Sequence, residues 1–152
     1  MKKIVAKLVA FLYPLIRLYW FLLRPRGRGV KVAITHKNEI LLVRHSYGKK
    51  YWTLPGGGMR KNETSEESAK REVKEEVGIE LKNVSPLGRF LKTDEYKQVG
   101  IWIFKAEVPN KKLGPKSFEI EEAQWFDLDD LPSNIGSTAK KFLEFKPPSP
   151  HR

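Results

Sequence analysis

Runs in which apolar and polar residues alternate predict most of the strands. Residues 30–35 (VKVAIT) and 39–45 (EILLVRH) flank a short polar turn, so they predict a β-hairpin. Further strands are predicted at residues 84–92, 99–108 and 123–127. The run at 99–108 is mostly apolar with β-branched residues, which indicates a strand buried on both faces.

The pattern changes to a helical period between Thr64 and Gly78. Thr64 and Glu67 have the spacing of a capping box, which predicts that a helix begins there. Gly78 is a typical residue after a helix C-terminus, so the helix should end near Val77. A last helix is predicted from Ser137, a residue type that caps helices, through Phe145.

The first of these helices carries three glutamates in one sector. At ~100° per residue, Glu72, Glu75 and Glu76 lie together, apart from an apolar stripe that should pack on the domain. Like charges four residues apart destabilise a helix by ~0.2–0.5 kcal/mol per pair, so this sector calls for a counter-charge. Oxygen ligands suit Mg²⁺, with Mn²⁺ as an alternative. An acidic surface helix is the simpler interpretation, but it does not explain the glycine-rich loop at residues 55–58.

These residues also form a known motif. The pattern Gly57-x5-Glu63-x7-Arg71-Glu72-Val73-x-Glu75-Glu76-x-Gly78-Ile79 resembles the Nudix box at every defined position. The order of the predicted elements over residues 29–145 is similar to the Nudix fold. The resemblance therefore implies an α/β protein, with a mixed β-sheet in an α/β/α sandwich.

The resemblance implies a role for each box residue. Glu72, Glu75 and Glu76 would bind the divalent metal, and backbone carbonyls of the loop at Gly57 can join its shell. Arg71 would orient the neighbouring glutamates, and Glu63 would have a supporting role. The implied activity is Mg²⁺-dependent hydrolysis of a diphosphate linkage in a nucleoside diphosphate-type substrate, by a water that the metal activates.

The residue that takes the proton of this water is left open. Family members use either a box glutamate, here Glu72 or Glu75, or a glutamate from a loop outside the box. Glu119 is the best candidate outside the box, with Glu121 and Glu122 as alternatives. An ordinary acidic turn is the competing interpretation for all three.

Candidates for substrate binding lie before the box. Arg44, at the end of an apolar strand, is expected either to bind a substrate phosphate or to pair with a carboxylate. Tyr51 and Trp52, like Tyr47 and Trp102, could stack on a base. The alternative is packing in the core, which is favoured for Trp102 because its strand is apolar.

Residues 1–28 form a basic and apolar segment ahead of the predicted domain, and residues 146–152 a proline-rich tail. The net charge of +11 is concentrated near the N-terminus, since residues 1–31 contain eight Lys and Arg and no Asp or Glu. A basic stripe beside aromatic residues suits a helix in the interface of an anionic membrane. The alternatives are a spanning anchor, a cleaved signal peptide, and a helix packed on the domain or on a second subunit.

Several functional alternatives stay open. The chain lacks cysteine, which excludes thiol catalysis and cysteine-zinc sites. A larger substrate is conceivable, such as an RNA 5′ end or a lipid-linked diphosphate, as is a non-catalytic nucleotide-binding module recruited to a membrane. No motif for sequence-specific nucleic-acid recognition is present, and a homodimer is neither indicated nor excluded. We expect a cytoplasmic protein, with peripheral attachment to the inner face of a membrane as an option.

Overall fold

Five strands form one mixed sheet. The computed structural model describes residues 7–8, 11–15, 26–94 and 97–145. The sheet has the order β3-β4-β1-β2-β5, in which β1 and β4 are parallel and the other neighbouring pairs are antiparallel. The elements, in chain order, are β1 Arg26–His36, β2 Glu39–His45, α2 Ser65–Val77, β3 Ser85–Asp94, β4 Lys97–Glu107, β5 Ile120–Asp127 and α3 Ser137–Phe145.

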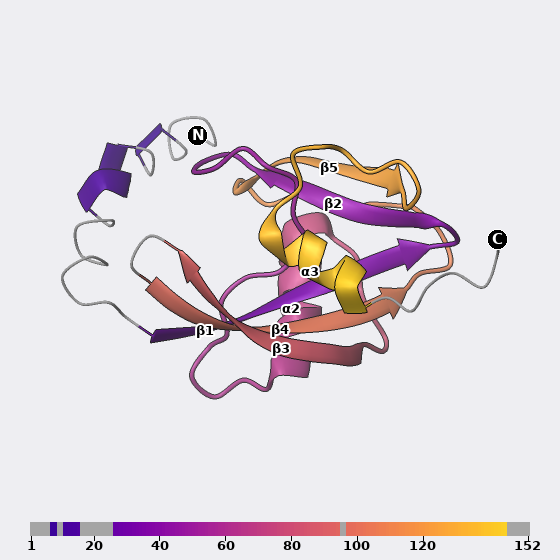
Figure 1. Ribbon diagram of the computed structural model, residues 1–152, viewed down its shortest axis with the longest axis horizontal. Coiled ribbons are helices and arrows are strands. Elements are labelled where there is room, and N and C mark those ends of the chain that lie inside the picture. Colours follow the sequence, from indigo (N-terminus) through magenta and orange to yellow (C-terminus); the bar gives the residue numbers. More distant parts are fainter. Residues whose placement is uncertain (1–6, 9–10, 16–25, 95–96, 146–152) are drawn as a thin grey trace.

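The two helices cover opposite faces of this sheet. In Figure 1, α2 lies behind the sheet and α3 lies in front of it. The stripe predicted for α2 is buried against β1 and its neighbours, through Ala69, Val73 and Val77. On the other face, Ala139 and Phe142 of α3 pack in a second apolar cluster. The arrangement is the α/β/α sandwich that the sequence predicts.

The hairpin strands β1 and β2 separate along their length, and the segment before α2 fills the space between them. Only Thr35 and His36 of β1 pair with β2. Further along, Thr53 exchanges two backbone hydrogen bonds of 2.9 Å with Val43 of β2. The carbonyls of Pro55 and Gly57 accept hydrogen bonds from Val32 and Val30 of β1, both 2.9 Å. This pairing fixes the glycine-rich loop between the strands, next to the N-terminal half of β1.

The structure agrees with the predicted ends of β2, α2 and α3, but β1 is longer than expected. It begins at Arg26 because it pairs with β4 from Arg26↔Gln98 onward, a contact that the local pattern does not reveal. The expectation that residues 99–108 are buried on both faces holds only in part. Lys105 and Glu107 are exposed, although they alternate in register with Ile103, which is buried in the second apolar cluster.

Only part of the N-terminal segment can be placed. Residues 7–8 and 11–15 are helical, and their apolar side chains Leu8, Phe11 and Leu15 are exposed. Within the described residues, no helix is long and apolar enough to cross a membrane. The remainder of the predicted leader, residues 1–6, 9–10 and 16–25, and the predicted tail at 146–152 lie outside the described residues.

Candidate active site

Local capping signals determine where α2 begins and ends. The Thr64 hydroxyl accepts a hydrogen bond from the Glu67 backbone N–H at 3.2 Å, and the Glu67 carboxylate accepts one from the Thr64 N–H at 2.8 Å. This reciprocal pair is the predicted capping box. At the other end, Gly78 adopts the left-handed conformation, with φ 68°, and its N–H donates to Lys74. The box glutamates therefore start from a well-defined helix.

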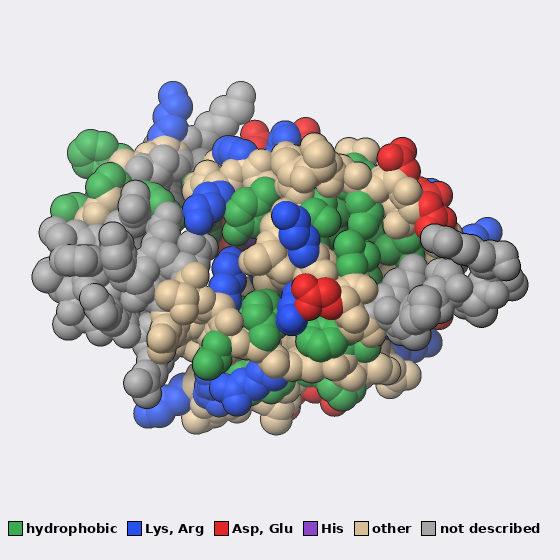
Figure 2. Space-filling view, viewed as in Figure 1, with side chains coloured by type: hydrophobic (Ala, Val, Ile, Leu, Met, Phe, Trp, Pro, Cys, Tyr) green, Lys and Arg blue, Asp and Glu red, His purple; other side chains and the backbone are tan. Residues whose placement is uncertain are grey.

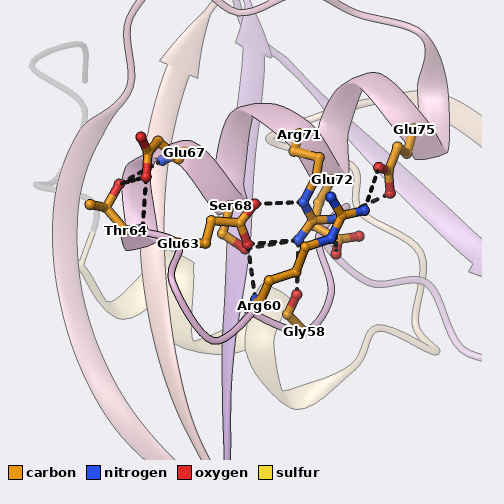
Figure 3. Close-up of polar contacts among 9 residues, drawn as sticks. All are labelled: Gly58, Arg60, Glu63, Thr64, Glu67, Ser68, Arg71, Glu72 and Glu75. Carbon is orange, nitrogen blue, oxygen red and sulfur yellow. Dashed lines mark hydrogen bonds and ion pairs between the residues drawn. The ribbon is translucent and has the colours of Figure 1, made fainter.

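Arg71 is the centre of the polar contacts on this helix (Figure 3). Its guanidinium donates to both carboxylate oxygens of Glu63, at 2.6 and 2.9 Å, and to the Gly58 carbonyl at 3.0 Å. It also donates to Glu72 at 2.7 Å and to Glu75 at 3.1 Å. The bidentate pair lowers the pKa of Glu63 to about 2. Arg71 thus joins the loop before α2 to two of the box glutamates.

Glu76 is the buried member of the acidic sector. Its residue is 3% exposed, and its carboxylate accepts a hydrogen bond of 2.7 Å from the Gly56 N–H. Burial raises the pKa of Glu76 to about 7, although the charge of Lys31 and the Gly56 N–H favour the ionised form. Lys31 in turn donates to the Gly56 carbonyl at 2.5 Å. A buried carboxylate and a partly buried ammonium therefore bind the N–H and the carbonyl of the same loop residue, Gly56.

The two glycines of this loop are needed for different reasons. Gly56 has φ 132°, and a Cβ there would lie 2.2 Å from the Val30 carbonyl oxygen, so no side chain fits. At Gly57, a Cβ would lie 2.6 Å from a carboxylate oxygen of Glu72. The Glu72 carboxylate therefore packs directly on the loop backbone. Glu76 and Glu72 therefore contact adjacent loop residues, Glu76 at Gly56 and Glu72 at Gly57.

The donor chemistry of this arrangement fits a hard divalent cation. Glu72 and Glu76 are close enough that the charge of Glu72 raises the pKa of Glu76, a repulsion that a cation would relieve. Glu75 is half-exposed and pairs with Arg60 and Arg71. Within the described residues, no three acidic or histidine side chains converge as a complete ligand set. The three glutamates of the predicted sector therefore differ in burial and in partners. Because Arg71 and Lys31 already provide counter-charge, the crowding of glutamates alone does not require a metal.

Glu119 lies close to these carboxylates. Its charge contributes to the raised pKa of Glu76, and its side chain hydrogen-bonds to the Tyr47 hydroxyl. Burial and the Glu119 charge raise the pKa of Tyr47 to about 12. The alternative candidates for the base, Glu121 and Glu122, are both exposed. Glu121 pairs with Lys50 at 3.0 Å.

Comparison with known proteins identifies the family. Residues 25–145 match the model of the NUDIX domain. The chain belongs to the Nudix hydrolase family. A NAD-capped RNA hydrolase NudC from Vibrio atlanticus is 33% identical over 116 residues, which are 74% of this chain and 42% of that protein. This chain therefore spans less than half the length of that relative.

Solved structures agree with this assignment. The crystal structure of a MutT NUDIX hydrolase from Burkholderia pseudomallei is 26% identical, with a TM-score of 0.73, over 79% of this chain and 97% of that one. The MutT protein of Methanosarcina mazei Go1 is 26% identical, with a TM-score of 0.71, over 80% of this chain and 93% of that one. The predicted family and the predicted fold are both confirmed.

Arg44 and Trp52 both contact other side chains of this Nudix domain. Arg44 forms ion pairs with Glu122 at 3.0 Å and Glu121 at 3.4 Å, across the pairing of β2 with β5. Trp52 is 7% exposed and packs edge-on against Phe126, with 4.8 Å between ring centroids. These placements correspond to the carboxylate-pairing alternative for Arg44 and the core-packing alternative for Trp52. Trp102, also considered for stacking, is half-buried, and the Arg89 guanidinium carbon lies 4.3 Å from its ring centroid.

A cavity of about 270 Å³ in the Nudix domain is connected to the box loop through Lys31, which lines it and donates to the Gly56 carbonyl. Tyr51, a predicted substrate-binding residue, lines it, as does Tyr47. The cavity is also lined by residues that the sequence did not single out, among them Lys31, His45, Lys49 and Lys92. Burial, together with the charge of Lys31, lowers the pKa of His45 to about 4, so its ring is neutral at pH 7. The alternating strand at residues 30–35 gives no signal for Lys31, because a lysine between two valines there is typical of a solvent-facing position.

Proposed function

We propose that this Nudix domain hydrolyses a diphosphate linkage in a nucleoside diphosphate-type substrate, with Mg²⁺ as its cofactor. The observation that carries the proposal is the approach of Glu72 and Glu76 to the Gly56–Gly57 loop, next to a cavity lined by lysines. Carboxylate and carbonyl oxygens are the donors that Mg²⁺ prefers, and Mn²⁺ would accept the same set.

The chain's own residues suggest how the reaction is organised. Glu72, Glu75 and Glu76 would hold the metal together with backbone oxygen of the loop at Gly57. When bound, Mg²⁺ would neutralise charge on the phosphate oxygens and lower the pKa of water. Arg71 keeps Glu72 and Glu75 oriented toward one side of α2 through its forked hydrogen bonds.

Hydrolysis also requires a base. A water oxygen forms a new bond to phosphorus, the bridging P–O bond breaks, and the water gives a proton to the base. Glu119 is the candidate that we favour. Its charge contributes to the raised pKa of Glu76, so it lies near the acidic sector although it does not belong to α2. Glu72 and Glu75 are both occupied by Arg71. The hydrogen bond from Tyr47 would keep the Glu119 carboxylate in position.

The cavity supports a phosphate-bearing substrate with a ring to stack. Three lysines, at positions 31, 49 and 92, provide positive charge around it, and Tyr47 and Tyr51 provide aromatic surface. A small nucleotide is the substrate that we favour. The 5′ end of an RNA is the second candidate, since the NudC relative is named for the hydrolysis of NAD-capped RNA and basic surfaces attract phosphate chains.

For localisation, we propose a cytoplasmic protein that attaches to an anionic membrane through residues 1–28. The exposed apolar side chains of Leu8, Phe11 and Leu15 support this, together with the basic composition of the segment. Sedimentation with anionic liposomes tests the proposal, and protein that stays in the supernatant would contradict it. A homodimer is the competing explanation for these apolar residues, and would be detected by light scattering without liposomes.

The proposed chemistry is tested with a panel of nucleotides. Products are separated by chromatography after incubation with Mg²⁺, with Mn²⁺, or with EDTA. Glu76→Gln should lower the rate by more than about 100-fold, since even the outer partners of metal ligands are worth 10–100-fold. Glu66→Gln is the matched control, because Glu66 is an exposed glutamate of the same helix that pairs with Lys70. Equal rates of hydrolysis for the wild type and Glu76→Gln would overturn the assigned chemistry, whereas no hydrolysis of any nucleotide by the wild type would favour a non-catalytic module.

A further inference from the structure

Lys31 occupies an unusual position in the sheet. It lies between Val30 and Val32, which are both fully buried in the strand that crosses the centre of the domain. A lysine at such a position is costly unless its ammonium reaches a partner. Here the ammonium donates to the Gly56 carbonyl, and its charge interacts with Glu76 and, more weakly, with Glu72.

Backbone pairing determines this position. The hydrogen bonds from Val30 to Gly57 and from Val32 to Pro55 place the loop antiparallel to β1, with Lys31 opposite Gly56. A Cβ on Gly56 would lie 3.0 Å from the Lys31 Cα, so the two backbones are in close contact. This pairing sets Lys31 beside the Gly56 carbonyl that its ammonium contacts, and a sliding of the loop along β1 would break both backbone hydrogen bonds.

The same side chain also lines the cavity. Lys31 forms the wall together with Lys49 and Lys92, and the charge of Lys92 repels that of Lys31. Figure 2 shows Lys and Arg side chains dispersed among apolar side chains on one face of the domain. Positive charges that surround one cavity favour an anionic ligand, whereas a lysine that only neutralised Glu76 would have no reason to face the cavity.

From this double contact we propose that Lys31 positions the substrate's diphosphate: its ammonium holds the Gly56 carbonyl and faces Glu76 in the metal-free protein, and contacts a phosphate oxygen when metal and substrate are bound. The inference rests on the proposed function. It predicts that Lys31 opposes the binding of a divalent cation alone, because both are positive and both approach the same carboxylates. It favours the binding of a diphosphate once the metal is present.

Two binding measurements on the full chain test these opposite effects. In Lys31→Met, Mn²⁺ should bind on the order of 30-fold more tightly in the absence of nucleotide, the effect expected from removing one unit charge about 4 Å from a divalent ion in water. Free Mn²⁺ is followed by electron paramagnetic resonance. In saturating Mg²⁺, the same variant should bind methylenediphosphonate, a diphosphate analogue whose P–C–P bridge cannot be hydrolysed, about tenfold more weakly, as measured by calorimetry.

Three further variants make the test decisive. Lys31→Arg keeps the charge and should retain most of the methylenediphosphonate affinity. Lys112→Met removes an exposed lysine from a distant loop and should change neither constant, which controls for net charge. If Lys31→Met does not fold, Lys31→Gln replaces it. Weakened binding of both ligands, or no change in either, would show that Lys31 has a purely structural role and would overturn the inference.

Failure of this inference and failure of the proposed function give different results. If the wild type hydrolyses nucleotides but Lys31→Met binds both probes as the wild type does, only the role of Lys31 is wrong. If the wild type hydrolyses nothing on the panel but the two affinities change in opposite directions, Lys31 still recognises a diphosphate, and the hydrolytic function is wrong.

Discussion

The charge state of Glu76 makes the stability of the metal-free protein depend on pH near neutrality. Burial raises the pKa of its carboxyl from the ordinary 4.5 to about 7. The folded protein therefore holds this proton more tightly than the unfolded chain does. The resulting stabilisation is fully present below pH 4.5 and is lost as the pH rises through 7.

The size of this effect follows from the two pKa values. At about 1.4 kcal/mol for each pKa unit, the difference between about 7 and 4.5 corresponds to about 3 kcal/mol. Glu76→Gln removes the titration but keeps an oxygen that can accept the Gly56 hydrogen bond. Relative to the wild type, the free energy of unfolding of this variant should rise by about 3 kcal/mol between pH 4.5 and pH 8. Any cost of the new amide is the same at each pH and cancels in this comparison.

Urea denaturation in EDTA, followed by tryptophan fluorescence, measures the difference at several pH values. Addition of Mg²⁺ at pH 8 should stabilise the wild type and have much less effect on Glu76→Gln, because the ligand stabilises only the form that binds it. The exposed Glu66→Gln variant should remain parallel to the wild type throughout. Unfolding free energies of wild type and Glu76→Gln that also run parallel from pH 4.5 to 8 would refute the burial argument.

Three further predictions concern the loop and the start of α2. Gly56→Ala should destabilise the fold by at least about 2 kcal/mol, because its Cβ would meet the Val30 carbonyl, whereas Gly58→Ala should be tolerated since its Cβ meets nothing within 4 Å; urea denaturation of both variants checks this. Thr64→Ala should cost about 1 kcal/mol by loss of the cap, again by urea denaturation, with an unchanged free energy contradicting the cap. Since the pKa of Glu63 is lowered to about 2, its stabilisation is present above pH 4.5 and lost as the pH falls through 2. Thermal unfolding of Glu63→Gln should lack that acid loss, and equal acid sensitivity of both proteins would contradict it.

The sequence predicts the box helix well because its signals are local. Thr64, Glu67 and Gly78 determine where α2 begins and ends through contacts within a few residues. The apolar stripe is equally local, since its spacing alone places it on the core side. The start of β1 is predicted less well, because its first residues become part of the strand by pairing with β4, some 70 residues away in the chain.

The candidate site is predicted only in part for the same reason. The box names Glu72, Glu75 and Glu76, but it does not reveal that one is buried, one is half-exposed and one packs on a glycine. These differences arise when the loop pairs with β1, which is a tertiary contact. Trp52 is a comparable case, since only the fold places Phe126 beside its ring.

Two positively charged side chains, Arg71 and Lys31, compensate much of the negative charge on the acidic helix. Repulsion among the glutamates suggests a need for metal, but Arg71 already bridges Glu63, Glu72 and Glu75, and the charge of Lys31 attracts that of Glu76. The folded domain is therefore compensated before any metal binds. A divalent cation in the proposed site would share carboxylates that Arg71 holds and would lie next to the Gly56 carbonyl that Lys31 holds. The metal affinity would then depend on how well the cation competes with Arg71 and Lys31 for these oxygens.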